Sequence, residues 1–282
     1  MHERMGEFEP YGDEWLVDLY FRHGSVENAI RSFDNLPVSV ASFHRAIKRY
    51  GVIKQAGRRR LSLAKTLYFF AQKALDPAVP LETLYRSMPP SFKQSASIGS
   101  LHRIYSGAMG RVERLHATGL IITPQGDGSR ILTVEEKTGE RTIPFGHSIK
   151  TEPAENSVLR VLQHEFSTKM TLERKLVKGS SLTRSLIPKN RDPLFRFHIL
   201  DIGVDIYHLE MPPEVVPVSF SSYKVSGHKF EDVEEVIAGS EGNTRYRVGT
   251  PELLGHYHDM VLGTAVETRR VSSLNKALLG QF

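Results

Sequence analysis

The first chemistry that the sequence offers lies in a segment with many basic residues and no acidic one. No Asp or Glu occurs between Asp34 and Asp76. The same interval holds nine cations: Arg45, Lys48, Arg49, Lys54, Arg58, Arg59, Arg60, Lys65 and Lys73. Cations without neighbouring carboxylates attract phosphates, and each contact gains from counterion release. The segment therefore favours nucleic-acid binding, and a solvated basic surface is the alternative.

Short helices are expected to position this charge. The spacing of apolar residues predicts three of them, over residues 13–22, 25–33 and 39–50. Ser25 is a good N-cap for the second helix, and a turn separates the second helix from the third. Because Val40, Phe43 and Ile47 share one face of the third helix, its polar side chains lie on the other face.

Residues 25–52, SVENAIRSFDNLPVSVASFHRAIKRYGV, resemble the helix-turn-helix of the Fis and resolvase-like DNA-binding families. Ala29 stands at the small-residue position of the second helix, and Val38-Ser39 open the recognition helix. The turn is longer here than the usual tight, glycine-bearing one. The resemblance implies that the third helix enters the major groove of DNA.

This resemblance gives the polar residues two roles. The recognition helix would present six of them to the groove: Ser39, Ser42, His44, Arg45, Lys48 and Arg49. Lys48, Arg49 and the run Arg58-Arg59-Arg60 would hold phosphates, because such a contact needs charge rather than a base edge. The alternative is an ordinary three-helix packing unit with a basic face.

Further helices are expected before the second half of the chain. Apolar spacing predicts them over residues 61–75, 81–88 and 97–106. Because the last two carry little basic charge, we expect a helical extension or dimerisation element. A second helix-turn-helix is the alternative. Gly107 and Gly110 mark the expected end of this region.

From residue 111 onward the pattern changes to strands. ERLHATGLIIT and RILTVEE are rich in β-forming residues, and the turn cluster 124–128 between them predicts a hairpin. The wing of a winged helix would give the same pattern. Residues 195–211 alternate in polarity and predict further strand structure.

Residues 143–166, IPFGHSIKTEPAENSVLRVLQHEF, resemble the Nudix box. Its pattern is G, five residues, E, seven residues, then R-E-U-x-E-E-x-G-U, where U is aliphatic. Gly146, Glu152, Arg160 and Glu165 match that pattern at the right spacing. The resemblance implies a Nudix-type α/β/α sandwich with a mixed sheet in the C-terminal half. It also implies a late strand within residues 221–239 and a closing helix over residues 251–266.

The chemistry that the Nudix resemblance implies is incomplete here. A Nudix hydrolase holds Mg²⁺ on helix glutamates, and the metal neutralises a diphosphate and activates water. Val161 and His164 stand at two of the three glutamate positions, and only Glu165 remains. Valine cannot coordinate a metal, and neutral imidazole is a poor ligand for Mg²⁺. We therefore expect no metal cofactor unless the site is active, with Glu152 and Glu165 as its Mg²⁺ ligands in that case.

Three other groups offer alternatives. Glu152 and Arg160 can pair with each other and fix the loop on the helix. An acidic cluster could supply a substitute ligand, although a solvated helix face explains it more simply: Glu231, Asp232, Glu234 and Glu235. A transition-metal site is disfavoured, because the spacing of three histidines is irregular: His228, His256 and His258.

Length and composition bound the class of protein. A length of 282 residues predicts two domains. Hydrophobic residues make up 40% of the chain and charged residues 24%, which are ordinary values for a globular protein. No apolar run approaches the roughly 18 residues that suggest a membrane helix, and the first residues lack the apolar core of a signal peptide. The absence of cysteine excludes disulfides and thiolate metal sites, so a cytoplasmic location is expected. The expected fold class is multidomain α plus α/β. Its parts are a helix-turn-helix domain at 1–57, a helical extension or second helix-turn-helix at 58–110, and a Nudix-like domain at 111–282.

These observations favour a DNA-binding, transcriptional regulator. Its catalytically degenerate Nudix-like domain would sense a nucleotide-derived small molecule or serve assembly. Its other partner would be double-stranded DNA. A homodimer would match half-sites about one helical turn apart, and no membrane partner is expected. One alternative is an active, Mg²⁺-dependent Nudix hydrolase of a nucleoside diphosphate derivative. Another is a non-enzymatic scaffold.

Overall fold

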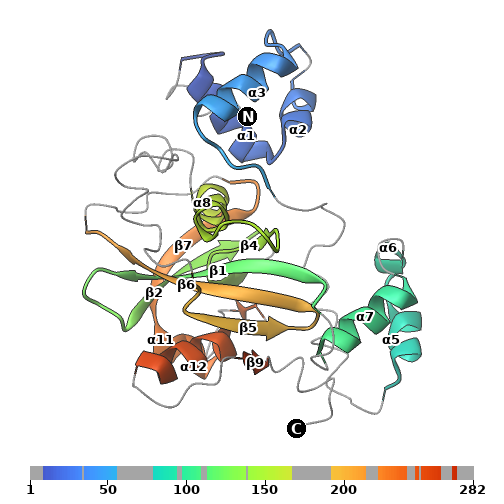
Figure 1. Cartoon of the computed structure of the whole chain (residues 1–282). Coiled ribbons are helices and arrows are strands. Elements are labelled where there is room, and N and C mark those ends of the chain that lie inside the picture. Colours follow the sequence, from blue (N-terminus) through green and yellow to red (C-terminus); the bar gives the residue numbers. More distant parts are fainter. Residues whose placement is uncertain are drawn as a thin grey trace.

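The structure is a computed structural model. It describes residues 9–33, 35–55, 79–93, 97–108, 113–137, 139–166, 192–213, 222–239, 245–247, 249–261 and 269–271. Figure 1 shows a group of short helices above a body of sheets and helices. Within the described residues, no helix is long and apolar enough to cross a membrane. The helix predicted over residues 61–75 lies outside the described residues.

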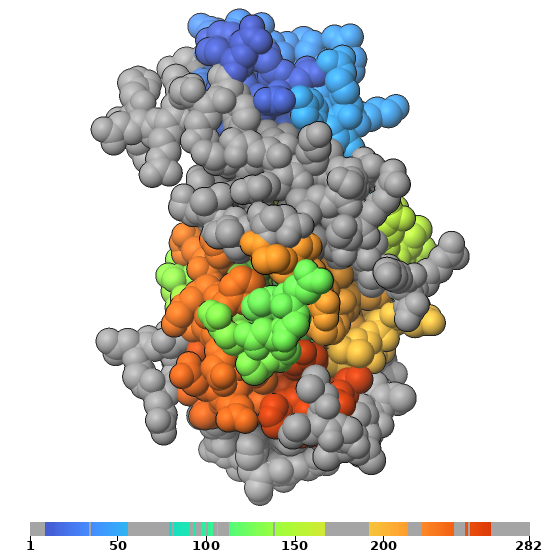
Figure 2. Space-filling model, turned by 90° about the vertical axis from the view of Figure 1, so that its left-hand side faces the viewer, coloured from blue at the N-terminus to red at the C-terminus, as the bar shows by residue number. Residues whose placement is uncertain are grey.

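Residues 9–55 form a small helical unit. It contains α1 (Asp13–His23), α2 (Val26–Arg31) and α3 (Val40–Arg49), in agreement with the expected ranges. Ser25 and Ser39 cap α2 and α3 through side-chain oxygens that accept backbone N–H bonds. Leu16 of α1 and the α3 residues Phe43 and Ile47 belong to one buried cluster. This unit, from here called the N-terminal unit, lies at the top of Figure 2 in blue.

A second group of helices follows. It consists of α5 (Leu81–Ser87), α6 (Pro90–Lys93) and α7 (Ile98–Ala108). Leu84, Met88 and Leu101 are buried in the same apolar cluster as strands of the C-terminal part. These helices therefore use apolar side chains to extend that core.

The larger sheet has five strands in the order β4-β1-β6-β5-β9 among the described residues. They are β4 (Phe145–Ser148), β1 (Leu115–Pro124), β6 (Ile202–Met211), β5 (Phe195–Ile199) and β9 (Arg269–Val271). β1 runs parallel to β6 and antiparallel to β4, so the sheet is mixed.

A smaller sheet has the order β7-β2-β3-β8 within the part of the chain that the structure describes. Its strands are β7 (Val225–Asp232), β2 (Arg130–Glu136), β3 (Glu140–Thr142) and β8 (Arg245–Tyr246). β2 pairs antiparallel with both β7 and β3. This sheet brings residues near 136, 224 and 247 toward one end of the larger one.

The hairpin predicted from β1 to β2 is wrong. β1 pairs with β4 and β6 in the larger sheet, whereas β2 pairs with β3 and β7 in the smaller one. The turn cluster 124–128 instead passes the chain to the other sheet. The same pairing rules out the winged-helix alternative, because a wing needs these two strands side by side.

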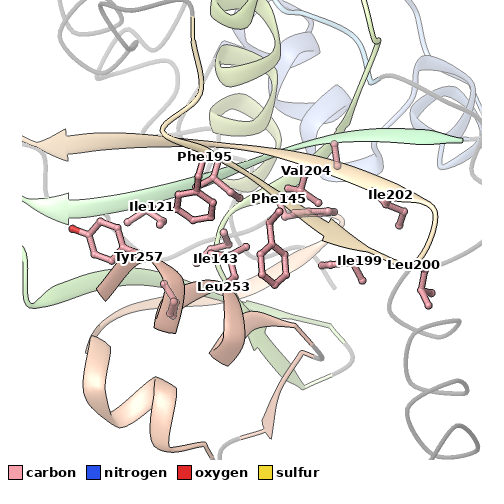
Figure 3. Close-up of a cluster of buried hydrophobic side chains, with 14 of the residues drawn as sticks. Ile121, Ile143, Phe145, Phe195, Ile199, Leu200, Ile202, Val204, Leu253 and Tyr257 are labelled. Atoms are coloured by element: carbon pink, nitrogen blue, oxygen red, sulfur yellow. The ribbon is translucent and has the colours of Figure 1, made fainter. Parts of the chain in front are cut away.

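Helices cover both faces of the larger sheet, as the predicted α/β/α sandwich requires (Figure 1). On one face lies α8 (Ala154–Glu165), and on the other lie α11 (Val233–Ala238) and α12 (Thr250–Val261). Leu120 and Ile122 of β1 join the α8 cluster, whereas Ile121 joins the cluster that contains Leu253 of α12. Figure 3 shows this second core between the strands and α12. The alternation of β1 side chains thus builds two cores.

Candidate functional site

β4 and the loop and helix that follow it carry the four residues that match the Nudix box. Gly146 lies in β4, Glu152 lies in the connecting loop, and Arg160 and Glu165 lie on α8. α8 packs closely on β4, and a Cβ built on Gly146 would lie 3.1 Å from Cγ2 of Val161. A glycine at this position therefore allows the helix to approach the strand.

Glu152 and Arg160 form a buried ion pair, with 9% and 5% of their side chains exposed. Arg160 Nη1 donates a 2.7 Å hydrogen bond to the carbonyl oxygen of His147. Glu152 Oε2 accepts a 3.2 Å bond from the backbone N–H of Ile149. Burial lowers the pKa of Arg160 from its ordinary value. The pair ties the loop to α8, which is the structural role expected for these two residues.

Glu165 is buried at the end of α8 and pairs with a cation from a distant segment. The Lys224 ammonium forms an ion pair with Glu165 Oε1 and donates a 2.6 Å hydrogen bond to the carbonyl oxygen of Phe145. Burial raises the pKa of Glu165, and the Lys224 charge opposes that rise. The remaining glutamate of the box is thus already neutralised by a lysine.

A second buried pair lies beside the first. Glu136 Oε1 is 3.1 Å from Nη1 of Arg247, and both side chains are less than a tenth exposed. The Glu136 charge adds to the rise in the pKa of Glu165, and the Arg247 charge opposes it. The Arg247 guanidinium also lies over the Phe145 ring, 5.0 Å from its centroid. We call Glu136, Glu165, Lys224 and Arg247 the charge network.

The remaining box positions do not fit a resident Mg²⁺ ion. Val161 is buried and offers no oxygen, and His164 offers nitrogen to a metal that prefers oxygen. His164 is also engaged elsewhere, because its Nε2 lies 3.1 Å from the carbonyl oxygen of Ile53. Among the described residues, no group of three or more His, Cys, Asp or Glu side chains could hold a metal.

The alternative metal ligands are held elsewhere. Glu231 is buried, pairs with Arg141 at 3.1 Å and accepts a hydrogen bond from Thr133. Asp232 caps α11 by accepting backbone N–H bonds. His256 packs edge-on against Phe195, with 4.5 Å between the ring centroids. These contacts give the polar groups structural roles.

The end of α8 is also where the N-terminal unit docks. Gln163 Oε1 accepts a 2.9 Å bond from the N–H of Ile53, and Gln163 Nε2 donates a 3.3 Å bond to the carbonyl oxygen of Gly51. The His164 ring packs edge-on against Tyr20 and Phe21, with centroids 5.9 and 5.4 Å away. The segment that leaves α3 is therefore fixed to the helix of the Nudix-like box.

A polar hollow of about 150 Å³ lies at the other end of α8. Its lining includes Glu152 of the box loop, Ser157 of α8 and Arg196 of β5. Arg196 is held at 2.6 Å by Glu113 and at 2.6 Å by Asp205. Both pairs are partly exposed. The hollow thus combines a fixed guanidinium with carboxylates and a hydroxyl.

The predicted DNA-binding residues of α3 divide into capping and exposed groups. Ser39 and Ser42 build the start of the helix, and Ser42 Oγ accepts a 2.9 Å bond from Arg45 Nη2. Arg45 and Lys48 are exposed, and so is Arg49, which pairs with Asp13 of α1.

His44 is half-buried, and its Nδ1 accepts a 3.2 Å bond from Lys54 Nζ. Arg58, Arg59 and Arg60 lie outside the described residues. The described part of this region therefore presents Arg45, Lys48 and Lys54 on or beside one helix.

Comparison with known proteins gives structural neighbours only. No family model matches the chain, and no curated protein matches it. An ADP-ribose pyrophosphatase from Streptococcus suis is similar at 13% identity and a TM-score of 0.37, covering 55% of this chain and 97% of that one.

Two further solved structures, both of hydrolases, are similar to the chain at comparably low identity. A NUDIX hydrolase from Nitrosomonas europaea has 12% identity and a TM-score of 0.35, with 55% of this chain and 76% of that one covered. A C. elegans Ap4A hydrolase has 14% identity and a TM-score of 0.35, with 53% and 98% covered.

Proposed function

We propose that the chain binds double-stranded DNA through its N-terminal unit, while a Nudix-like C-terminal domain acts as a non-hydrolytic ligand-binding or assembly module. One observation carries the non-hydrolytic half. The end of α8, where the Nudix pattern has two glutamates, carries His164 and a lysine-paired Glu165. Gln163 and His164 there bind the segment that leaves α3. The helix end that would serve catalysis serves docking.

The DNA half of the proposal rests on α3. Arg45 and Lys48 are exposed on this helix, and Asp13 of α1 is paired with Arg49. Phosphates would therefore meet cations that are not already neutralised. The N-cap end of α3 carries Ser39 and Ser42, whose small side chains let a helix lie close to base edges.

The ligand half rests on the hollow at the start of α8. Its lining residue Glu152 holds Arg160 of α8, and the far end of the same helix holds Gly51 and Ile53. A ligand that moved Glu152 would therefore act on α8, and α8 holds the segment that follows α3. The hydroxyl groups of a nucleotide-derived molecule would suit the carboxylates and the hydroxyl of this lining.

DNA binding is tested by a mobility shift on random duplex DNA over a salt series. The double variant Arg45→Ala/Lys48→Ala should weaken binding about tenfold or more and lower the salt slope by about 1 to 2. Lys229→Ala is the matched control, because this exposed lysine lies on β7. A variant that shifts DNA like the control would disprove the α3 interface. The absence of any shift at low salt would favour a scaffold.

An active hydrolase is the competing function, favoured by the intact spacing of Gly146, Glu152, Arg160 and Glu165. Incubation with a panel of nucleoside diphosphate derivatives and Mg²⁺ or Mn²⁺ tests it. We expect no release of phosphate or nucleoside monophosphate. Release that disappears in Glu165→Gln would overturn the non-hydrolytic half of the proposal.

A further inference from the structure

The charge network carries an inference about metal binding. We propose that the Lys224 ammonium takes the place of a divalent cation in the Nudix-like box and keeps the box closed to metal. The inference rests on the non-hydrolytic half of the proposed function and gives its physical cause. It concerns the described residues of this chain, in which the expected Mg²⁺ ligands are incomplete.

The surroundings of Lys224 are those of a bound cation. Its Nζ contacts a carboxylate oxygen of Glu165 and the carbonyl oxygen of Phe145. Hard divalent cations in proteins use the same two kinds of oxygen. The second oxygen of Glu165, Oε2, is buried and has no hydrogen-bond partner among the described residues. The carboxylate therefore retains an acceptor that an ammonium in this position does not use.

The charges of the network balance only because the lysine is present. Glu136 and Glu165 contribute two negative charges, and Lys224 and Arg247 contribute two positive ones. A dication added to this set would leave excess positive charge beside the buried ammonium. The resulting repulsion is strong where little water screens it. Lys224 thus blocks a metal both by occupying the oxygens and by its charge.

Removal of the lysine should reverse both effects. Without Lys224, the network has one net negative charge, two carboxylates and one free carbonyl oxygen. Mg²⁺ and Mn²⁺ commonly bind to one or two carboxylates and keep several waters. The space vacated by the four-carbon side chain would admit such waters. The variant chain should then bind a divalent cation that the natural chain rejects.

The test measures Mn²⁺ binding by the full-length protein, from the electron paramagnetic resonance signal of free Mn²⁺. The variants are Lys224→Ala and, to retain the apolar stem, Lys224→Met. Lys229→Ala removes an exposed lysine five residues further along the chain and serves as the matched control. Adding Glu165→Gln to either Lys224 variant removes the main carboxylate, and circular dichroism checks that each protein is folded.

We expect Lys224→Ala or Lys224→Met to gain Mn²⁺ affinity about 10- to 100-fold over the natural chain, and Glu165→Gln to abolish the gain. Lys229→Ala should match the natural chain. Either of two results would overturn the inference. One is a folded Lys224→Ala protein that gains no binding, because this variant vacates the space that the waters need. The other is Mn²⁺ binding by the natural chain that Glu165→Gln removes, which requires no Lys224 variant.

Failure here is separable from failure of the proposed function. If the natural chain binds Mn²⁺ at Glu165 and hydrolyses no substrate, only the lysine inference fails. If the natural chain hydrolyses a nucleoside diphosphate derivative, the non-hydrolytic function fails as well. The mobility shift with Arg45→Ala/Lys48→Ala tests DNA binding in all cases, because neither residue touches the charge network.

Discussion

The two glutamates of the Nudix-like box have similar surroundings but partners of different origin. Glu152 and Glu165 are both largely buried beside α8, and each forms an ion pair. Arg160, the partner of Glu152, lies eight residues away on the box helix. Lys224, the partner of Glu165, lies 59 residues away, immediately before β7. One pair is local and the other joins two segments of the fold.

This difference separates the contact that fixes the loop of the box from the contact that neutralises Glu165. The local pair fixes the loop to α8 and needs only residues of the motif. In the distant pair, the cation at the end of α8 is Lys224, which lies outside the motif. A box can therefore keep its shape through Glu152 and Arg160 while the surroundings of Glu165 are altered by the sheet. The following variants test how independent these two pairs are.

The local pair should have the larger effect on stability. Arg160→Ala leaves Glu152 buried without its cation and the His147 carbonyl without its donor. We expect the free energy of unfolding to fall by about 3–5 kcal/mol, measured by urea denaturation. The control Glu155→Ala lies exposed on the same helix and should cost under about 1 kcal/mol. A similar small loss for Arg160→Ala would show that the pair does not hold the loop.

The distant pair should have a smaller effect that depends on pH. Lys224→Met should lower the free energy of unfolding by about 2–3 kcal/mol near pH 7.5, less than a fully buried pair because 26% of the lysine side chain is exposed. Lys224→Met/Glu165→Gln should regain most of this loss, since no buried charge is left unpaired.

The sign of the pH effect follows from Glu165. Burial raises the pKa of its folded carboxyl above the ordinary value of 4.5, so the folded state holds the proton more tightly than the unfolded state. Stability therefore falls as pH rises from about 4.5 through the folded pKa. Lys224→Met removes a cation that opposes the raised pKa, which widens this window. Its deficit should shrink toward pH 4.5, and a deficit independent of pH would contradict the assignment.

Local patterns predicted much of the fold. The three helices of the N-terminal unit follow from apolar spacing and caps, and the strands within 195–211 follow from alternation. The closing helix was expected only from the Nudix resemblance. The pairing of β1 was predicted wrongly, because an apolar strand does not specify its neighbours. β6 pairs with β1 from nearly ninety positions further along the chain, a contact that spacing alone does not encode.

The candidate site was predictable only where its partners are local. Glu152 and Arg160 share one motif, so their pairing could be expected. Lys224, Glu136 and Arg247 come from different segments, and no spacing rule brings them to Glu165. The docking role of Gln163 and His164 was missed for the same reason. A lysine just before β7 that can neutralise Glu165 becomes recognisable only in the folded sheet.

The close packing between α8 and β4 gives a third test. It concerns the position of α8, on which both ion pairs depend. Gly146→Ala places a Cβ 3.1 Å from Cγ2 of Val161, so the helix must move. We expect a loss of about 1–2 kcal/mol in thermal unfolding. Val161→Ala in the same chain should relieve the contact and recover part of the loss. If the two substitutions cost the sum of their separate effects, the contact does not limit the approach of α8.

The smallest expected effect lies at the junction with the N-terminal unit. Gln163→Ala removes the acceptor of the Ile53 N–H and the donor to the Gly51 carbonyl, while leaving both ion pairs intact. A net loss of about 1 kcal/mol should speed hydrogen exchange of the Ile53 amide about fivefold. The Phe43 amide bonds to Ser39 within α3 and serves as the internal control. Equal acceleration at both amides would indicate unfolding of the whole unit. Selective acceleration at Ile53 would show that Gln163 holds the segment behind α3 to the end of α8.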